Sequence, residues 1–175
     1  MIGLLRFVGV CNAAVWIGAA FWFIFGADPA ATSQEMKDLL GARNYPYFSI
    51  AISQILSTRY FHLFFVCSLL ALLHLAAEWL YLGKYPKRLW LALVVSLWLF
   101  GVLQVWWLQP HLKAWHYTRY AQRPTSEQAG RALRAWSVVS EGANLVALCA
   151  LAFYLWRVAN PPDPARFVSA TKFRS

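Results

Sequence analysis

Residues 57–82 read STRYFHLFFVCSLLALLHLAAEWLYL, and this stretch decides the fold. At 1.5 Å per helical residue, it is long enough to cross the roughly 30 Å hydrocarbon core of a bilayer. Lipid offers no hydrogen-bond partners to the peptide backbone, so a single segment that crosses it is expected to be helical. The stretch therefore predicts a transmembrane α-helix.

Three further segments have the same apolar character: residues 3–26, 89–108 and 133–158. Together the four segments predict an all-α integral membrane protein built as a four-helix bundle. A hydrophobic content of 60% and a charged content of 13% indicate one transmembrane domain, over residues 1–160. Residues 161–175 begin with PPDP and predict an extended polar tail.

The net charge of +9 does not indicate a nucleic-acid-binding protein, because Lys and Arg border the spans instead of forming one basic face. We expect the lipid bilayer to supply the counterions. Cys11, Cys67 and Cys149 lie in apolar segments and predict no disulfide framework. The apolar stretch after Arg6 is too long for a signal peptide, so we interpret it as a retained first span.

Basic residues also bear on topology. Four spans place both termini on one side, and the two sides carry equal numbers of Lys and Arg. The positive-inside rule gives most weight to short loops beside span ends. The turn from Lys84 to Arg88 concentrates three cations, which favours cytoplasmic termini, and we expect a bacterial inner (plasma) membrane.

Extra helices are expected on the face opposite the termini. Thr32 and Glu35 have capping-box spacing, and Gly41 is placed to end the short helix that they would begin. Pro46 can open a helix that continues into the second span, and residues 111–122 extend the third. Tryptophans expected to anchor the spans at the two interfaces are Trp22, Trp106, Trp107 and Trp136 at one and Trp79, Trp90 and Trp156 at the other.

Polar residues inside the spans are the candidate functional residues, because they are costly in lipid. We expect them to face the bundle interior. They are Arg6 and Asn12 in the first span, His62, His74 and Glu78 in the second, and Glu141 and Asn144 in the fourth.

Depth limits how these residues can pair. His62 and Glu141 belong to one half of the bilayer, and Arg6 and Glu78 belong to the other. One interpretation is two interhelical pairs that set helix rotation, each worth about 1 kcal/mol. The alternative is a proton or ion path through His62, His74, Glu78 and Glu141.

The spacing of the His and Glu residues in the spans does not match the known patterns of metal and haem ligands. A di-iron bundle needs a Glu from each of two helices and a Glu-x-x-His motif from each of the other two, whereas the only Glu residues in the spans are Glu78 and Glu141. His62 and His74 share one helix and point about 120° apart, so paired haems are not expected and a single haem ligand stays open. We expect no metal and no cofactor.

Small residues mark where helices can approach closely in a membrane. On the first span these are Ala14 and Gly18, and on the fourth Ala143 and Ala147. They can pack inside the bundle or against a partner, which leaves a membrane-protein partner or a homo-oligomer open.

Three sequence features resemble the uncharacterised four-span family related to transmembrane protein 205: Trp16-x-Gly18-x-x-Phe21, Pro110, and Ser140-x-x-x-Asn144. The resemblance is clearest from Gly130 to Tyr154, where Ser137 stands in place of the family's histidine. It implies the four-span fold and a membrane location. The family brings no established reaction or ligand, and Ser140 and Asn144 are expected to make interhelical hydrogen bonds.

No phosphate loop or nucleophile elbow appears, so we expect a non-enzymatic protein. The hypothesis we favour is a structural or accessory subunit that packs with other membrane proteins. The alternatives are a small transporter or channel that uses the buried His and Glu, and a haem-binding electron-transfer subunit.

Overall fold

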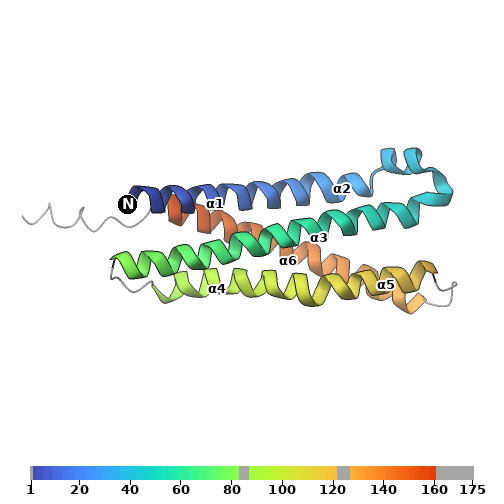
Figure 1. The fold of residues 1–175 in the computed structure, drawn as a ribbon. Helices are drawn as coiled ribbons and strands as arrows, with labels where there is room; N and C mark the ends of the chain where they lie inside the picture. The colour runs from blue at the N-terminus through green and yellow to red at the C-terminus, as the bar shows by residue number, and fades with distance from the viewer. Residues whose placement is uncertain (1, 83–86, 122–126, 161–175) are drawn as a thin grey trace, which may run out of the picture.

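The computed structural model describes residues 2–82, 87–121 and 127–160, and every element in these ranges is a helix. In chain order the elements are α1 (Ile2–Trp22), the π-helical turn η1 (Phe23–Ala27), α2 (Asp28–Ala31), α3 (Gln34–Leu82), α4 (Arg88–Leu103), the π-helical turn η2 (Gln104–Leu108), α5 (Gln109–Ala121) and α6 (Glu127–Ala159). They form four long rods, shown in Figure 1: α1 continued by η1 and α2, then α3, then α4 continued by η2 and α5, and finally α6.

Each rod is long and apolar enough to cross a membrane. The candidate spans are Leu4–Ala31, Tyr47–Leu80, Arg88–Trp115 and Ala135–Ala159, and each overlaps one of the four predicted segments. The predicted all-α fold with four spanning helices is therefore confirmed. The expected polar tail at 161–175 lies outside the described residues.

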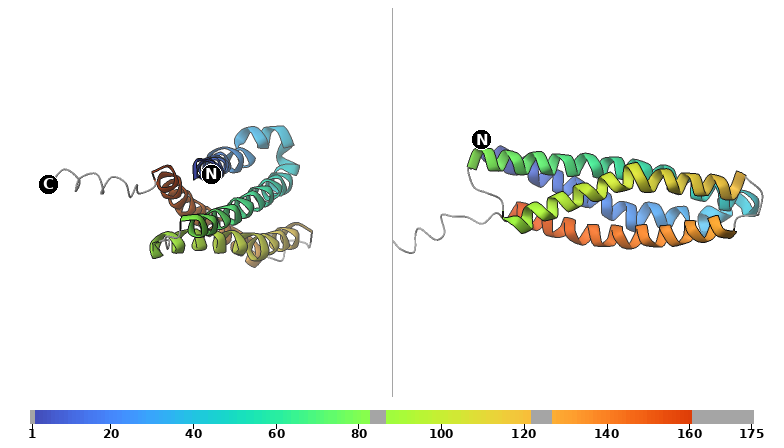
Figure 2. Two further views of the ribbon diagram at one scale, coloured as in Figure 1. Left: turned by 60° about the vertical axis from the view of Figure 1, so that its left-hand side comes forward. Right: turned by 90° about the horizontal axis from the view of Figure 1, so that it is seen from below.

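The rods form a bundle in which each has two neighbours. α1 packs against α3 and α6, α4 packs against α3 and α6, and α5 packs against both α3 and α6. Within the described residues no Cα atom of α3 lies within 8 Å of a Cα atom of α6, so these two helices occupy opposite corners of the bundle, as the views in Figure 2 show. Neighbouring rods run antiparallel because the connections between them are short.

The two ends of the bundle differ. α1 begins and α6 finishes at one end, which we call the termini end, and the other is the distal end (Figure 1). At the distal end α2, the first turns of α3 and α5 extend the bundle, as expected for the face opposite the termini. α3 bends there at Gly41, whose φ of 71° and ψ of 155° separate a short helix from the long spanning one.

At the distal end, side-chain hydrogen bonds join α3 to two other rods. Ser49 Oγ donates to the Ala31 carbonyl, and Ser53 Oγ donates to Asp28 Oδ1 at 2.7 Å. Gln54 Nε2 donates to the Leu112 carbonyl at 3.2 Å. We call Ser49, Ser53 and Gln54 the distal clamp, because they join α3 to the α1–α2 rod and to α5.

The predicted cap at Thr32 is displaced by one residue. Ser33 Oγ accepts the hydrogen bond from the Met36 amide at 3.1 Å, whereas Thr32 Oγ1 donates back to the Pro29 carbonyl. Thr32 is the C-cap residue of α2, so the hydroxyl of Ser33 caps the start of the following helix instead.

We predict that Gly41→Ala destabilises the folded protein by about 1–3 kcal/mol, because a side chain is strained in this backbone conformation. The thermal unfolding midpoint in detergent measures the loss. Gly18→Ala is the matched control, since this helical glycine has no other atom within 4 Å of an added Cβ. Equal midpoints for the two variants would contradict the role given to Gly41.

Candidate functional site

The polar residues predicted from the sequence divide into two groups. Asn144 and His74 are buried, and Asn12 and Glu78 are half-buried on the inner side of their helices. Arg6, His62 and Glu141 are exposed. The expectation that all seven face the interior is therefore wrong for the last three.

His74 joins α3 to the first turns of α1. Its Nε2 lies 2.9 Å from the Leu5 carbonyl oxygen, and because a carbonyl can only accept, this nitrogen carries the hydrogen. The contact depends on Gly9, where an added Cβ would lie 2.7 Å from His74 Nε2 and 3.1 Å from Val158. Gly9 thus lets α1, α3 and α6 meet around one imidazole.

Deeper in the same half, Asn12 and Tyr154 continue this polar region. Asn12 Nδ2 donates to the Cys67 carbonyl at 3.0 Å. The Tyr154 hydroxyl lies beside Asn12 and within electrostatic reach of Glu78, yet has no partner at hydrogen-bond distance. We call His74, Asn12, Tyr154 and Glu78 the termini-end cluster.

Aromatic rings fill the centre of the bundle. Trp16 packs edge-on against Phe64, with ring centroids 4.8 Å apart, and against Tyr154 at 5.8 Å. Trp90 stacks on Tyr154 at 5.3 Å, and Phe100 meets Phe64 at 5.5 Å. Trp16 and Phe64 each have 0% of their surface exposed, so this aromatic centre is closed to solvent.

The distal half holds a second set of buried polar groups. Tyr60, Gln104 and Asn144 lie on the inner stripes of their helices, and each has a polar atom without a hydrogen-bond partner: the hydroxyl, Oε1 and Oδ1 respectively. Sequence reasoning passed over Gln104, although a lone amide inside the apolar run 89–108 was a usable signal. Gln104 also begins η2, and π-helical turns are frequent at functional sites.

The predicted pairs do not form within the chain. His62 and Glu141 lie on α3 and α6, which occupy opposite corners of the bundle, and both side chains are exposed. His62 Nδ1 is instead 2.6 Å from the Thr58 carbonyl of its own helix. No ion pair joins Arg6 to Glu78 in the described part of the chain, and Arg6 is exposed.

The small residues predicted to pack helices closely also divide into a group that faces the bundle and a group that is exposed. Ala147 is buried, and Ser140 and Ala143 are half-buried, so these face the bundle. Ala14 and Gly18 are exposed, and nothing lies within 4 Å of a Cβ added at Gly18. Internal close packing uses Gly9, Ala13 and Ala20 on α1.

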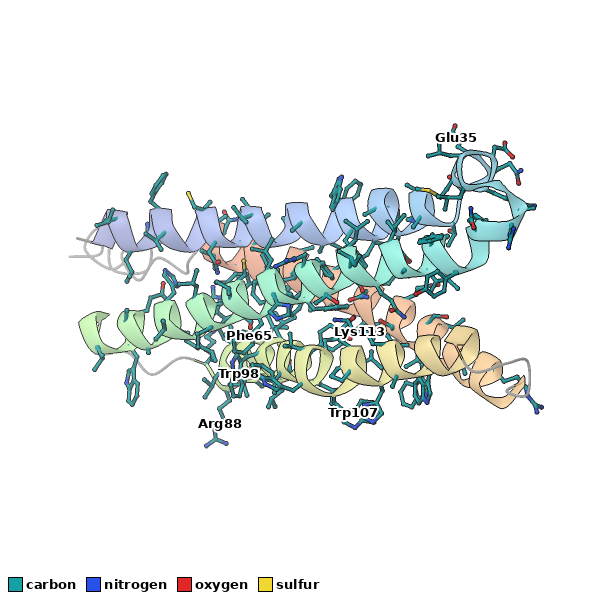
Figure 3. All side chains as sticks on the ribbon, turned by 45° about the vertical axis from the view of Figure 1, so that its right-hand side comes forward. Glu35, Phe65, Arg88, Trp98, Trp107 and Lys113 are labelled. Carbon is teal, nitrogen blue, oxygen red and sulfur yellow. The ribbon has the colours of Figure 1, made fainter. Side chains whose placement is uncertain are left out.

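The tryptophans predicted as interfacial anchors are mostly exposed. Trp22, Trp106 and Trp107 near the distal end, and Trp79 and Trp156 near the termini end, have 41% or more of their surface exposed. Figure 3 shows Trp107 at the outer edge of η2, where its ring meets Trp136 of α6 at 5.3 Å, and Arg88 projecting from the start of α4. Trp90 is half-buried because it stacks on Tyr154.

We predict that Gly9→Ala destabilises the bundle by about 1–3 kcal/mol, because the new methyl group overlaps the His74 ring. The unfolding midpoint in detergent tests this. Gly18→Ala, on the open side of the same helix, is the matched control and is expected to change stability by about 0.5 kcal/mol or less. A Gly9→Ala variant as stable as the control would rule out the tight contact.

Comparison with known proteins adds no relative: no family model matches the sequence, and neither a curated protein nor a solved structure matches it. The resemblance to the family related to transmembrane protein 205 therefore rests on its motif residues alone.

Proposed function

We propose that this chain is a non-enzymatic structural or accessory component of a membrane assembly, which acts by packing its lipid-facing surface against other membrane proteins. The observation that carries the proposal is Glu141, an exposed carboxylate on α6. It lies six residues inside the span that begins at Ala135, about 9 Å along the helix. Ionisable residues at such positions in a membrane almost always face protein or water, so a partner surface accounts for it.

The filled interior supports the same proposal. A transporter of ions or solutes needs a polar route through the bundle, and the fully buried rings of Trp16 and Phe64 separate the termini-end cluster from the polar groups of the distal half. Their tight edge-on packing favours a rigid body that presents its outer surface.

A small transporter or channel is the alternative that a specific observation favours. Buried polar atoms without a hydrogen-bond partner lie in the aromatic centre itself, on Trp16 and Tyr154, and in the distal half, on Tyr60, Gln104 and Asn144. Such atoms are costly in a dry interior and are normally satisfied by water or ligand. Rotation of the Phe64 ring would then be the event that joins the two regions.

A haem-binding subunit finds less support. His74 Nε2 is held by the Leu5 carbonyl, and Gly9 and Val158 fill the space beside it. His62 faces outward from α3, so a haem there would sit on the lipid-facing surface. For localisation we propose a bacterial inner membrane with cytoplasmic termini, on the charge of the Lys84 to Arg88 turn.

The proposal is tested by native mass determination on tagged protein extracted in a gentle detergent, with a visible spectrum of the same sample. We expect a colourless complex heavier than one 20.0 kDa chain. A single chain in every mild detergent and in native nanodiscs would contradict an assembly role, and a haem spectrum would favour the electron-transfer alternative.

The transport alternative predicts a measurable effect of Glu78, the half-buried carboxylate of the termini-end cluster. If the bundle conducts protons or cations, wild-type protein in liposomes gives a flux that Glu78→Gln reduces at least tenfold. We expect no flux above empty liposomes. Glu35→Gln removes an exposed carboxylate outside the spans and serves as the control.

A further inference from the structure

His62 and Glu141 are placed for contact with another protein chain. Each is an ionisable side chain exposed on the outer surface of a spanning helix, at one of two opposite corners of the bundle. In lipid neither side chain would have a partner of opposite charge, and leaving an ionisable group unpaired there raises the free energy of the protein. Their chemistry is complementary, because an imidazole and a carboxylate form a charge-assisted hydrogen bond.

The two residues lie at matching depths. The rings of Trp107 and Trp136 lie 5.3 Å apart, so these two residues share one depth in the bundle. Ser57 and Gln109 are joined by a hydrogen bond and share a second depth, which is two residues farther along the rod of α4, η2 and α5. Glu141 lies five residues beyond Trp136, and His62 lies five residues beyond Ser57, which places each about 8 Å from its reference residue toward the bilayer centre. The depths of His62 and Glu141 therefore agree to within about one helical turn. Copies inserted with the same topology would bring them face to face.

The hydrogen bond that His62 makes within α3 leaves its second ring nitrogen available to another group. Nδ1 is 2.6 Å from the Thr58 carbonyl, which can only accept, so Nδ1 carries a hydrogen, and Nε2 takes no part in this bond. A carboxylate also only accepts, so it bonds to Nε2 when His62 is the imidazolium, which carries a hydrogen on both ring nitrogens. Arg59, also exposed and one turn nearer the distal end, adds positive charge to the same part of α3. This region of α3 is therefore suited to an incoming carboxylate.

The surfaces around both residues are apolar and can pack in a membrane. Along α3, Val66, Leu69 and Leu73 are exposed below His62. Along α6, Val138 and Leu145 are exposed beside Glu141, and Gly142 has open space in front of it that admits a neighbouring helix closely.

We propose that the partner in the assembly is a second copy of this chain, which seats its α6 against α3 of its neighbour so that the Glu141 carboxylate meets His62 Nε2, with Arg59 beside it. This inference rests on the proposed function and names its partner. The two surfaces belong to opposite corners of one bundle, so the contact is head-to-tail, and each copy engages two different neighbours. Such an assembly contains three or more copies.

The decisive test is crosslinking in native membranes between two differently tagged copies. Both lack native cysteines through Cys11→Ser, Cys67→Ala and Cys149→Ala, and one carries His62→Cys while the other carries Glu141→Cys. A short bis-maleimide should join the two tags. Crosslinking within one chain is not expected, because positions 62 and 141 are exposed on helices at opposite corners of the bundle. The depth control replaces His62→Cys with Leu73→Cys, about 16 Å deeper on the same face, and should give no product.

Charge exchange tests the pair without cysteines. His62→Glu places two carboxylates together and should weaken self-association at least tenfold, measured by energy transfer between labelled copies in liposomes. The exchanged variant, His62→Glu with Glu141→His, should recover it. Glu35→Gln, which removes a carboxylate at the distal surface seen in Figure 3, should leave association unchanged.

The outcomes separate this inference from the proposed function. Crosslinking of the 62 and 141 positions together with a mass of three or more chains supports both. A heavy complex that contains other proteins, without this crosslink, overturns self-assembly and leaves an accessory role. A single chain under all mild conditions, without crosslink, overturns both. A complex of two chains alone overturns the head-to-tail arrangement.

Discussion

The peptide backbone cannot hydrogen-bond to lipid, and most of this structure depends on that constraint. It makes all four spans helical, and it leaves helix packing to shape and to a few polar contacts instead of hydrophobic burial. In this bundle the helices are held together by closely packed side chains at its centre. Trp16, Phe64 and Tyr154 tie α1, α3 and α6 together by edge-on ring contacts, and Gly9 admits the imidazole of His74 between helices.

Sequence reasoning predicted the parts of the fold that depend on local chemistry. Apolar length identified four spans, and glycine in the right place identified the bend at Gly41. The inward placement of Asn12, His74 and Asn144 also followed from the cost of polar groups in lipid. These features need no knowledge of which helix lies beside which.

The orientation of His62 and Glu141 could not be predicted in the same way. Helical periodicity shows that residues share a face, but whether that face points inward depends on helix rotation and on the order of helices around the bundle. The inward expectation assumed that one chain must satisfy its own polar groups. With α3 and α6 on opposite corners, that assumption fails for this pair. Gln104 and Tyr154 are uncharged, so a hydropathy pattern does not single them out. Their buried polar atoms without hydrogen-bond partners are identified only from the structure.

The distal clamp has a consequence for how the protein meets bilayers of different thickness. The second span covers 34 residues, about 50 Å of helix, against a hydrocarbon core of about 30 Å. A free helix of that length would relieve the mismatch by tilting alone. Here Ser49, Ser53 and Gln54 join α3 to two other rods beyond the core, so a single helix cannot tilt without breaking those bonds. Hydrophobic mismatch would therefore be absorbed by tilting the whole body or by deforming the surrounding lipid.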